Sequence, residues 1–498
     1  MSHWIILPLL LPLVAGMLNL LLVRTGLAAQ RTVSILTACS LLASTLLLLA
    51  RAAAGHIDVY ELGNWPAPFG IVLVLDRLSA LMLVLTALLA LPVLMHACFG
   101  DDQRGRDFHV LFPVQILGIN GAFLTGDLFN LFVFFEILLI ASYCLALHGH
   151  GPERIRSALR YVVLNLIGSS LFLIALGVLY GVCGTLNMAD LALKVADSAP
   201  GQAALLHAAA LLLLIVFGLK SAILPLFLWL PRLYAAVLPS VAALFAIMTK
   251  VGVYAILRTQ SLIFTAHGPV PQSATVLLPL ALATLAISAL CVLGSTRLRE
   301  LLAWLVIVSV GTLLTGIGLW TQAGISASLY YLPHTTLVTA GLFLLSHHIT
   351  RQRGIASDQL EPGPPMSQPN LIGALFLLGA LASAGLPPLS GFVGKVLLLH
   401  AALPAHTPWL WTIVLGGSLL GLVALARCGS ALFWKTEGIP VSGTAEPWSR
   451  LAPAAALILA AVVLTAMAGP VTAYTNATAG QLLSPNTYIE AVLGGVNP

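Results

Sequence analysis

Apolar runs of about twenty residues recur along the whole of this 498-residue chain. A helix of about twenty apolar residues is long enough to cross the roughly 30 Å hydrocarbon core of a bilayer. The chain is 59% hydrophobic and only 8% charged, and its mean hydropathy is +1.02. Soluble domains carry about 25% charged residues. The sequence therefore predicts an all-α integral membrane protein that forms a single polytopic domain over residues 1–498.

The apolar runs predict about fourteen transmembrane helices. We expect them near residues 3–23, 32–50, 71–97, 108–125, 128–147, 160–183, 203–235, 238–258, 274–294, 301–320, 325–349, 370–402, 409–434 and 451–470. The seventh and twelfth runs, 203–235 and 370–402, exceed the length of one straight span. Both contain proline near the middle, so we expect both helices to be broken.

Basic residues concentrate in the loops that follow odd-numbered helices. The odd-numbered loops contain Arg24, Arg31, Arg104, Arg106, Arg154, Arg156, Arg232, Arg297, Arg299, Arg351, Arg353, Lys435 and Arg450. The even-numbered loops hold little beyond Arg51, Lys194 and Arg258. Because positive loops stay in the cytoplasm, both termini are predicted to lie outside. The first run, which no basic segment precedes, is interpreted as a transmembrane helix rather than a cleaved signal.

Sequence signatures of bound cofactors and of nucleic-acid binding are missing. The six cysteines occur singly, without a CxxC pair or a Cys/His cluster, so the sequence gives no support for zinc, haem or iron–sulfur sites. It also lacks the glycine-rich motifs that bind nucleotide phosphates. The net charge of +5 is scattered between helices, which indicates no nucleic-acid partner. We therefore expect neither a cofactor nor a metal.

Four ionisable residues, Glu136, Lys220, Lys250 and Lys395, lie inside apolar runs. A charge at the centre of a bilayer costs roughly 2.5–3.5 kcal/mol on insertion scales, so such residues are usually functional. Burial favours the neutral form of a lysine amine, and a nearby carboxylate favours the charged form. A Glu–Lys pair can therefore switch its protonation, and the four residues predict a proton relay. The alternative is a set of structural salt bridges between helices.

Prolines interrupt two of the helices close to these lysines. Pro225 removes the helical hydrogen bond to the carbonyl of Ser221, and the prolines of GLPP at 385–388 do the same to Ser383 and Ala384. Backbone groups freed in a membrane must meet protein, water or ions. Discontinuous helices in the two halves of a chain are typical of transport sites. A packing kink is the alternative, and the lysine close to each break favours a transport site.

Other polar residues are weaker candidates for the relay. His334 can link the lysines because an imidazole titrates near neutral pH, and a hydrogen-bonded core histidine is the alternative. Asp127 is expected to cap a helix. Asp76 is expected to fix the end of the third helix. His347 and His348 are interpreted as residues at the surface.

Three stretches of the sequence form recognisable motifs: DLFNLFVFFEILLIASY (127–143), LKSAILPLFLWLPRLYAAVLPSVAALFAIMTKVGVYAILR (219–258) and GLPPLSGFVGKVLLL (385–399). They resemble signatures of one family, the proton-translocating antiporter-like membrane subunits. This family includes subunits of Mrp multisubunit Na⁺/H⁺ antiporters, respiratory complex I and membrane-bound hydrogenases. The length and the lysine segment look most like the D subunit of Mrp antiporters.

The resemblance implies two inverted five-helix repeats, helices 4–8 (residues 108–258) and 9–13 (residues 274–434). Residues 1–107 and 435–498 would flank them. It also implies relay roles for Glu136, Lys220, Lys250 and Lys395. The sequence departs from the family pattern in three places: Phe227 replaces a histidine, RLRELLAWLVIVS (297–309) carries Glu300 and Trp304 as replacements, and PHTTLVT lacks a lysine and keeps only His334.

The expected function is that of a transporter subunit rather than an enzyme. The resemblance implies a proton-conducting subunit of a Na⁺/H⁺ antiporter that works with the A, B, C, E, F and G subunits in a bacterial cytoplasmic membrane. A proton-pumping subunit of complex I or of a hydrogenase is the alternative, because redox centres would lie on other chains. A structural scaffold is the third interpretation.

Overall fold

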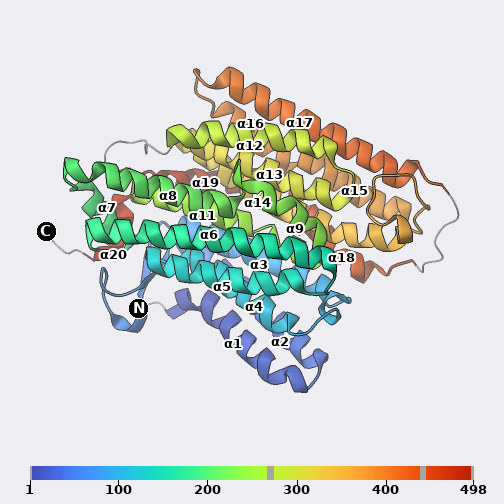
Figure 1. The fold of residues 1–498 in the computed structure, drawn as a ribbon, viewed down its shortest axis with the longest axis horizontal. Helices are drawn as coiled ribbons and strands as arrows, with labels where there is room; N and C mark the ends of the chain where they lie inside the picture. Colours follow the sequence, from blue (N-terminus) through green and yellow to red (C-terminus); the bar gives the residue numbers. More distant parts are fainter. Residues whose placement is uncertain (1–2, 266–273, 438–444, 495–498) are drawn as a thin grey trace.

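The computed structural model describes residues 3–265, 274–437 and 445–494 of the chain. Most of these residues are helical, and the long helices lie roughly side by side (Figure 1). Within the described ranges, eleven segments are long and apolar enough to cross a membrane. The protein is therefore a multi-pass integral membrane protein, as predicted. The exact number of spans and the division into repeats stay predictions.

The helices of the first half follow the expected order. They are α1 (Leu7–Leu21), α2 (Leu27–Ala53), α3 (Arg77–Ala97), α4 (Phe108–Leu124), α5 (Leu128–Leu147), α6 (Pro152–Cys183), α7 (Met188–Ala196), α8 (Ala203–Ser221), α9 (Leu230–Ala236), α10 (Pro239–Phe245) and α11 (Met248–Leu262). The predicted helix 203–235 is broken into α8 and α9, as expected. The predicted helix 238–258 is also divided, into α10 and α11, which was not expected from the sequence.

The second half contains the other predicted break. Its helices are α12 (Ala274–Gly294), α13 (Leu298–Gly318), α14 (Gln322–Arg353), α15 (Pro369–Ala384), α16 (Ser390–His400), α17 (Thr407–Gly429), α18 (Trp448–Ala466), α19 (Ala468–Leu482) and α20 (Asn486–Leu493). The predicted helix 370–402 is divided into α15 and α16. The C-terminal segment forms α19 and α20.

One predicted helix, 71–97, is wrong at its beginning. Strand β2 (Val72–Leu75) pairs there with β1 (Asp58–Glu61) in antiparallel register, and α3 begins only after Asp76. Asp76 caps α3 by accepting a hydrogen bond from the Ser79 amide, so its expected role at the helix end is confirmed. The Val-Leu-Val-Leu sequence is fully buried, which suits a strand as well as an apolar helix.

Asp76 also binds Arg258, which was expected in a loop. Arg258 lies inside α11 and is 4% exposed, and its guanidinium contacts both oxygens of Asp76 at 2.7 and 2.8 Å. The ring of Tyr488 from α20 lies 5.2 Å from the guanidinium carbon. This buried charge therefore joins α3, α11 and α20 rather than marking a loop.

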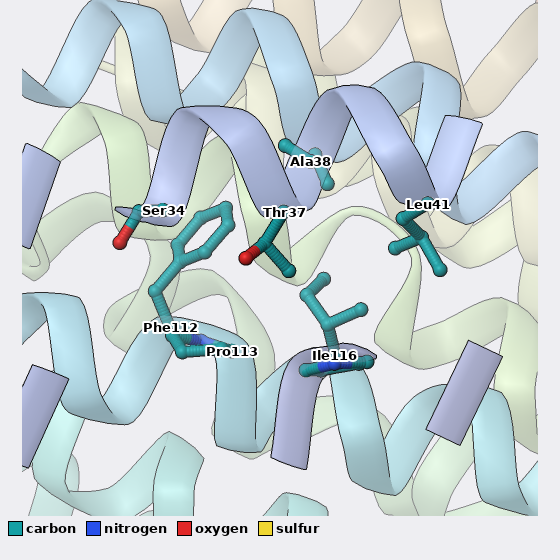
Figure 2. Close-up of a pocket in the computed structure, with 9 residues that line it drawn as sticks. Ser34, Thr37, Ala38, Leu41, Phe112, Pro113 and Ile116 are labelled. Atoms are coloured by element: carbon teal, nitrogen blue, oxygen red, sulfur yellow. The ribbon is translucent and has the colours of Figure 1, made fainter. Parts of the chain in front are cut away.

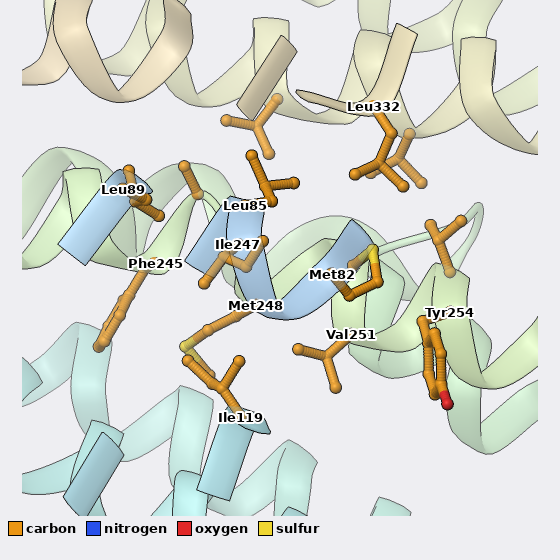
Figure 3. Packing of buried hydrophobic residues seen from close by; sticks show 14 of the residues in the cluster. Met82, Leu85, Leu89, Ile119, Phe245, Ile247, Met248, Val251, Tyr254 and Leu332 are labelled. Atoms are coloured by element: carbon orange, nitrogen blue, oxygen red, sulfur yellow. The ribbon is translucent and has the colours of Figure 1, made fainter. Parts of the chain in front are cut away.

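The segment α10–α11 forms the centre of the bundle, and α11 is buried along its whole length. Figure 3 shows Met248 and Val251 of α11 near Ile119 of α4. Ile247, which connects α10 to α11, lies near Leu85 of α3. This enclosure places Lys250 among packed side chains with 0% exposure. A lysine that is so completely buried needs polar partners within the protein.

A small cavity lies among the N-terminal helices. Its volume is about 20 Å³, and it lies between α2 and α4 (Figure 2). Phe112 and Ile116 of α4 face Thr37 and Leu41 of α2 across it. Such a space holds about one water molecule, and its lining is mostly apolar. The cavity is therefore a packing gap rather than a binding site.

A charged anchor fixes the loop between α3 and α4. Asp102 accepts two hydrogen bonds from Arg31 of α2, at 2.7 and 2.9 Å, and contacts His109 at 3.1 Å. Burial opposes ionisation of the Asp102 carboxyl, but the hydrogen bonds from His109 and Arg31 outweigh it, so its pKa lies below the ordinary value. The anchor is consequently charged at neutral pH.

The substitution Asp102→Asn should lower stability at pH 7 by about 1–3 kcal/mol, because Arg31 loses its buried partner. A lowered carboxyl pKa contributes stability that is complete above its unfolded value of about 4 and is lost as pH falls through the lowered value. The difference in stability between Asp102→Asn and wild type should therefore disappear in acid. Thermal unfolding between pH 3 and 7 measures it, with Asp58→Asn in the more exposed Arg51 pair as control. An unchanged difference at pH 3 contradicts the assignment.

Gly252 allows α8 and α11 to approach each other closely. A Cβ atom at this position would lie 2.6 Å from the Ser221 nitrogen and 2.9 Å from the Phe217 carbonyl oxygen. Both atoms belong to the backbone of the last turns of α8, so neither can move away alone. A glycine here sets the spacing between the two helices that carry Lys220 and Lys250.

We expect Gly252→Ala to destabilise the protein by about 1–3 kcal/mol through overpacking. Gly177→Ala on α6 is the matched control, because a Cβ atom at Gly177 meets nothing within 4 Å. Thermal unfolding of both variants in detergent tests this prediction. Equal effects of the two substitutions would show that the contact does not limit helix spacing.

Candidate functional site

Lys220 lies in the last turn of α8, directly before the first break. The helix ends at Ser221, and Ala222 takes a left-handed conformation with φ +62°. The Lys220 side chain is buried, and its Nζ donates a hydrogen bond to Asn165 Oδ1 of α6 at 3.0 Å. Its ammonium also lies 5.8 Å from the centre of the Phe135 ring. A neutral amide oxygen is therefore the direct partner of this lysine.

Glu136 is half-buried on α5 and accepts a hydrogen bond from Ser169 of α6. In the described part of the chain, no ion pair joins Glu136 to Lys220 directly. The two residues are instead linked through α6, because Asn165 and Ser169 are four residues apart on one helix face. Sequence reasoning missed both, although polar residues at this spacing in an apolar helix are the signal.

Lys250 points from α11 toward α13. Its Nζ donates a hydrogen bond to Ser309 Oγ at 3.2 Å. One turn further along α13, Thr312 interacts with the hydroxyl of Tyr331 on α14, which also interacts with Thr335. These hydroxyl groups continue a polar series from Lys250 toward α14. The lysine was expected from the sequence, and the hydroxyl groups were not.

Lys395 of α16 folds back onto the second break. Its Nζ donates hydrogen bonds to the carbonyl oxygens of Ala384 at 2.7 Å and of Ser383 at 3.5 Å. These are the carbonyls that were expected from the sequence to lose their helical partners, and this expectation is confirmed. The chain turns at Gly385, whose φ of +81° favours glycine. The lysine thus satisfies backbone groups that a continuous helix would satisfy itself.

His334 joins the two halves of the broken helix. Its Nδ1 hydrogen bonds with Ser390 Oγ of α16 at 2.8 Å, and its Nε2 lies beside the Ala382 carbonyl of α15. A Cβ atom at residue 391 would lie 2.7 Å from Nε2, so Gly391 makes room for the imidazole. His334 and Lys395 therefore bind neighbouring carbonyls in the last turn of α15.

A cavity of about 20 Å³ lies beside His334, and Tyr331, Thr335 and Ser383 are among its lining residues. This volume accommodates about one water molecule, and hydroxyl groups supply hydrogen-bond partners for it. A water there would complete the polar series from Lys250 to Lys395.

Two of the departures from the family pattern contact each other. Phe227, in the short 3₁₀ segment between α8 and α9, and Trp304 of α13 pack edge to face, with ring centres 5.5 Å apart. Such an aromatic contact is worth about 0.5–1.5 kcal/mol beyond its buried area. The two replacements therefore act together as an apolar contact near the first break.

Two minor expectations have different outcomes. Asp127 caps α5 by accepting a hydrogen bond from the Asn130 amide at 2.8 Å, so its capping role is confirmed. The surface assignment of His348 is wrong. His348 is 2% exposed and hydrogen bonds with Glu446, and His347 is only partly exposed. Helix α14 continues to Arg353, which carries both histidines against α3 and the loop before α18.

The family model described as "NADH:quinone oxidoreductase/Mrp antiporter, TM" matches residues 125–421, more than half of the chain. The chain belongs to this antiporter family. The match covers Glu136, both broken helices and all three buried lysines. The family expected from the sequence motifs is thus confirmed.

Relatives in this antiporter family match along almost the entire chain. The D subunit of a probable K⁺/H⁺ antiporter from Rhizobium meliloti is 39% identical and covers 99% of this chain and 98% of its own. The D subunit of the Na⁺/H⁺ antiporter from Alkalihalophilus pseudofirmus is 36% identical, and the match covers 99% of this chain and 100% of that subunit.

Solved structures are similar over the same length. A chain of the Mrp complex from Dietzia sp. DQ12-45-1b has a TM-score of 0.90 at 29% identity. The match covers 99% of the present chain and 100% of the Dietzia chain. A chain of respiratory complex I from Thermus thermophilus has a TM-score of 0.81 at 24% identity, again with 99% and 100% covered. The second likeness shows a shared fold alone.

Replacing Asn165 by Leu should lower stability by about 3 kcal/mol, because the buried amine of Lys220 would lose its partner. The added substitution Lys220→Met should recover part of this loss, since it removes the unpaired amine. A double-mutant cycle on thermal unfolding measures the coupling. Ser170→Ala is the control on the exposed side of α6. Strictly additive effects of the two substitutions on the free energy of unfolding would contradict a contact between Asn165 and Lys220.

Proposed function

We propose that this chain is the proton-conducting D subunit of a multisubunit monovalent cation/H⁺ antiporter. It is a transporter subunit rather than an enzyme. One observation carries the proposal: polar side chains in the interior of the bundle, Glu136, Lys220, Lys250, His334 and Lys395, make hydrogen bonds across five helix interfaces. The names of the full-length relatives, which are D subunits of antiporters, support the same conclusion.

The lysines suit proton transfer because each binds neutral oxygens. Nζ of Lys220 binds an amide, that of Lys250 a hydroxyl, and that of Lys395 two carbonyls. A carboxylate in direct contact would hold the ammonium charged, whereas neutral partners leave the balance between charged and neutral forms to neighbouring charges. Arrival of a proton at one lysine therefore favours its departure from the next.

Glu136 supplies the negative charge at one end of this series. It acts on Lys220 through the polar face of α6 rather than by direct contact. A proton on Glu136 would remove the charge that stabilises the Lys220 ammonium, so the two sites are coupled. At the other end, His334 and Lys395 share the opened turn of α15, where backbone oxygens accept from the lysine ammonium.

The position of the chain in the cell and in its complex follows from the same assignment. We place it in a bacterial cytoplasmic membrane with the A, B, C, E, F and G subunits, and propose external termini. The beginning of α1 and the helix α20 lie at one end of the bundle, as this orientation requires (Figure 1). The relatives are named for different cations, K⁺ and Na⁺. We propose Na⁺ as the exchanged cation.

Glu136→Gln and Lys220→Ala should each abolish Na⁺/H⁺ exchange, because either change removes one side of the coupled pair. Exchange is measured in vesicles from cells that express the whole complex, as recovery of a fluorescent pH signal after addition of Na⁺ or K⁺. Lys194→Ala on α7 is the control, since this lysine is exposed outside the relay. Normal exchange in either relay variant, with the protein present in the membrane, would leave a scaffold as the remaining interpretation.

A proton-pumping subunit of a redox complex is the second candidate, favoured by the fold shared with complex I. Isolation of the intact complex separates the two functions. Copurification of small membrane subunits without flavin or iron–sulfur proteins supports the antiporter. A flavin or iron–sulfur subunit in the purified complex would overturn it.

A further inference from the structure

A second group of ionisable residues lies outside the relay, where the end of α3 meets the end of α14. His96 is on α3, Asp101 is in the following loop and His347 is on α14. One nitrogen or oxygen atom from each lies within 4.8 Å of the others. The ring of His348 completes the group, with its centre 5.3 Å from that of His96. We call His96, Asp101 and His347 the histidine–aspartate cluster.

The inner atoms of the histidine–aspartate cluster have no hydrogen-bond partners in the described part of the chain. These atoms are Nδ1 of His96 and Oδ1 of Asp101, whose residues are 3% and 1% exposed. Nε2 of the neighbouring His348 is also buried without a partner. Each unsatisfied buried polar atom costs about 1–3 kcal/mol, so three in one place call for a ligand.

A second triad of potential ligands shows the contrast. Cys98, Asp102 and His109 also lie within 4.8 Å of one another. However, both oxygens of Asp102 bind Arg31, and the two ring nitrogens of His109 bind Asp102 and Ser34. These hydrogen bonds use the lone pairs that a metal would need. The second triad is therefore a structural anchor and not a site.

The surroundings hold the histidine–aspartate cluster in place. Oδ2 of Asp101 accepts a hydrogen bond from Ser240 Oγ at 2.7 Å, which leaves Oδ1 turned toward the histidines. Nε2 of His148 hydrogen bonds with the Asp101 carbonyl at 3.0 Å. Outer contacts of this kind orient the ligands of metal sites.

His347 connects the histidine–aspartate cluster to an open cavity of about 370 Å³. Arginines line this cavity, which opposes the approach of a cation. Arg299 and Arg351 are paired with carboxylates, at 3.2 and 3.3 Å, so their charges are partly offset. Arg104 lies 3.8 Å from Oδ1 of Asp101 and is half-exposed. A bound cation would compete with Arg104 for this oxygen.

We propose that His96, Asp101 and His347 bind a divalent transition metal of the Zn²⁺ class. Two imidazoles and one carboxylate form a common Zn²⁺ ligand set, and water or His348 would take the fourth position. Tetrahedral coordination places ligand atoms roughly 3.4 Å apart, so each ligand would move inward by about 1 Å. The site is independent of the proposed transport function, and its role would be to tie α3 to α14.

Zinc binding to the full-length purified chain tests the site. The protein is equilibrated with Zn²⁺, passed through a desalting column and assayed for metal per chain. We expect one Zn²⁺ for wild type and an affinity at least about tenfold weaker for His96→Ala, Asp101→Asn and His347→Ala. His207→Ala, at an exposed position on α8, is the control and should bind normally. Mg²⁺ should not compete, because it prefers oxygen ligands.

Two further measurements guard against misfolded variants and adventitious binding. Arg104→Gln should bind Zn²⁺ more tightly than wild type, a gain that misfolding cannot produce. X-ray absorption of the bound zinc should show nitrogen and oxygen ligands at about 2.0–2.2 Å and no sulfur. Absence of bound zinc in wild type, wild-type affinity in all three ligand variants, or a sulfur ligand from Cys98 would each overturn the proposal.

Discussion

The absence of water from the bilayer core is the constraint on which this structure depends. Each backbone carbonyl that loses its helical partner there must find another within the protein. At the second break the partner is Lys395, whose ammonium binds the two carbonyls that the prolines set free. The break and the charge therefore stabilise each other. Either one alone would leave buried polar groups without partners.

At the first break the lysine has a different partner. Lys220 binds the amide of Asn165 on a neighbouring helix rather than the carbonyls of its own break. Its position consequently depends on how α6 and α8 pack, and Gly252 sets how closely α8 meets α11. The position of the Lys220 ammonium therefore depends on Gly252 and on the spacing of α8 from α6 and α11. The half-buried Glu136 acts on Lys220 through Ser169 of the same α6 face.

The fold class, the two proline breaks and the buried lysines followed from the sequence because they depend on local composition and on proline geometry. Pro387 and Pro388 even identified the carbonyls that Lys395 binds. Strand β2 was missed because a short apolar run suits a strand as well as a helix. The break between α10 and α11 was missed for a related reason, since its residues are apolar on both sides.

The sequence by itself determined that this protein crosses the membrane many times with charges inside, because apolar length and the cost of buried charge are properties of short segments. Only the tertiary structure decided the partners. Asn165 and Ser169 separate Glu136 from Lys220, and Phe227 meets Trp304. His347, interpreted as a surface residue, lies beside Asp101. Such contacts join residues that are distant in the chain, and the packing of whole helices, rather than any local pattern, brings them together.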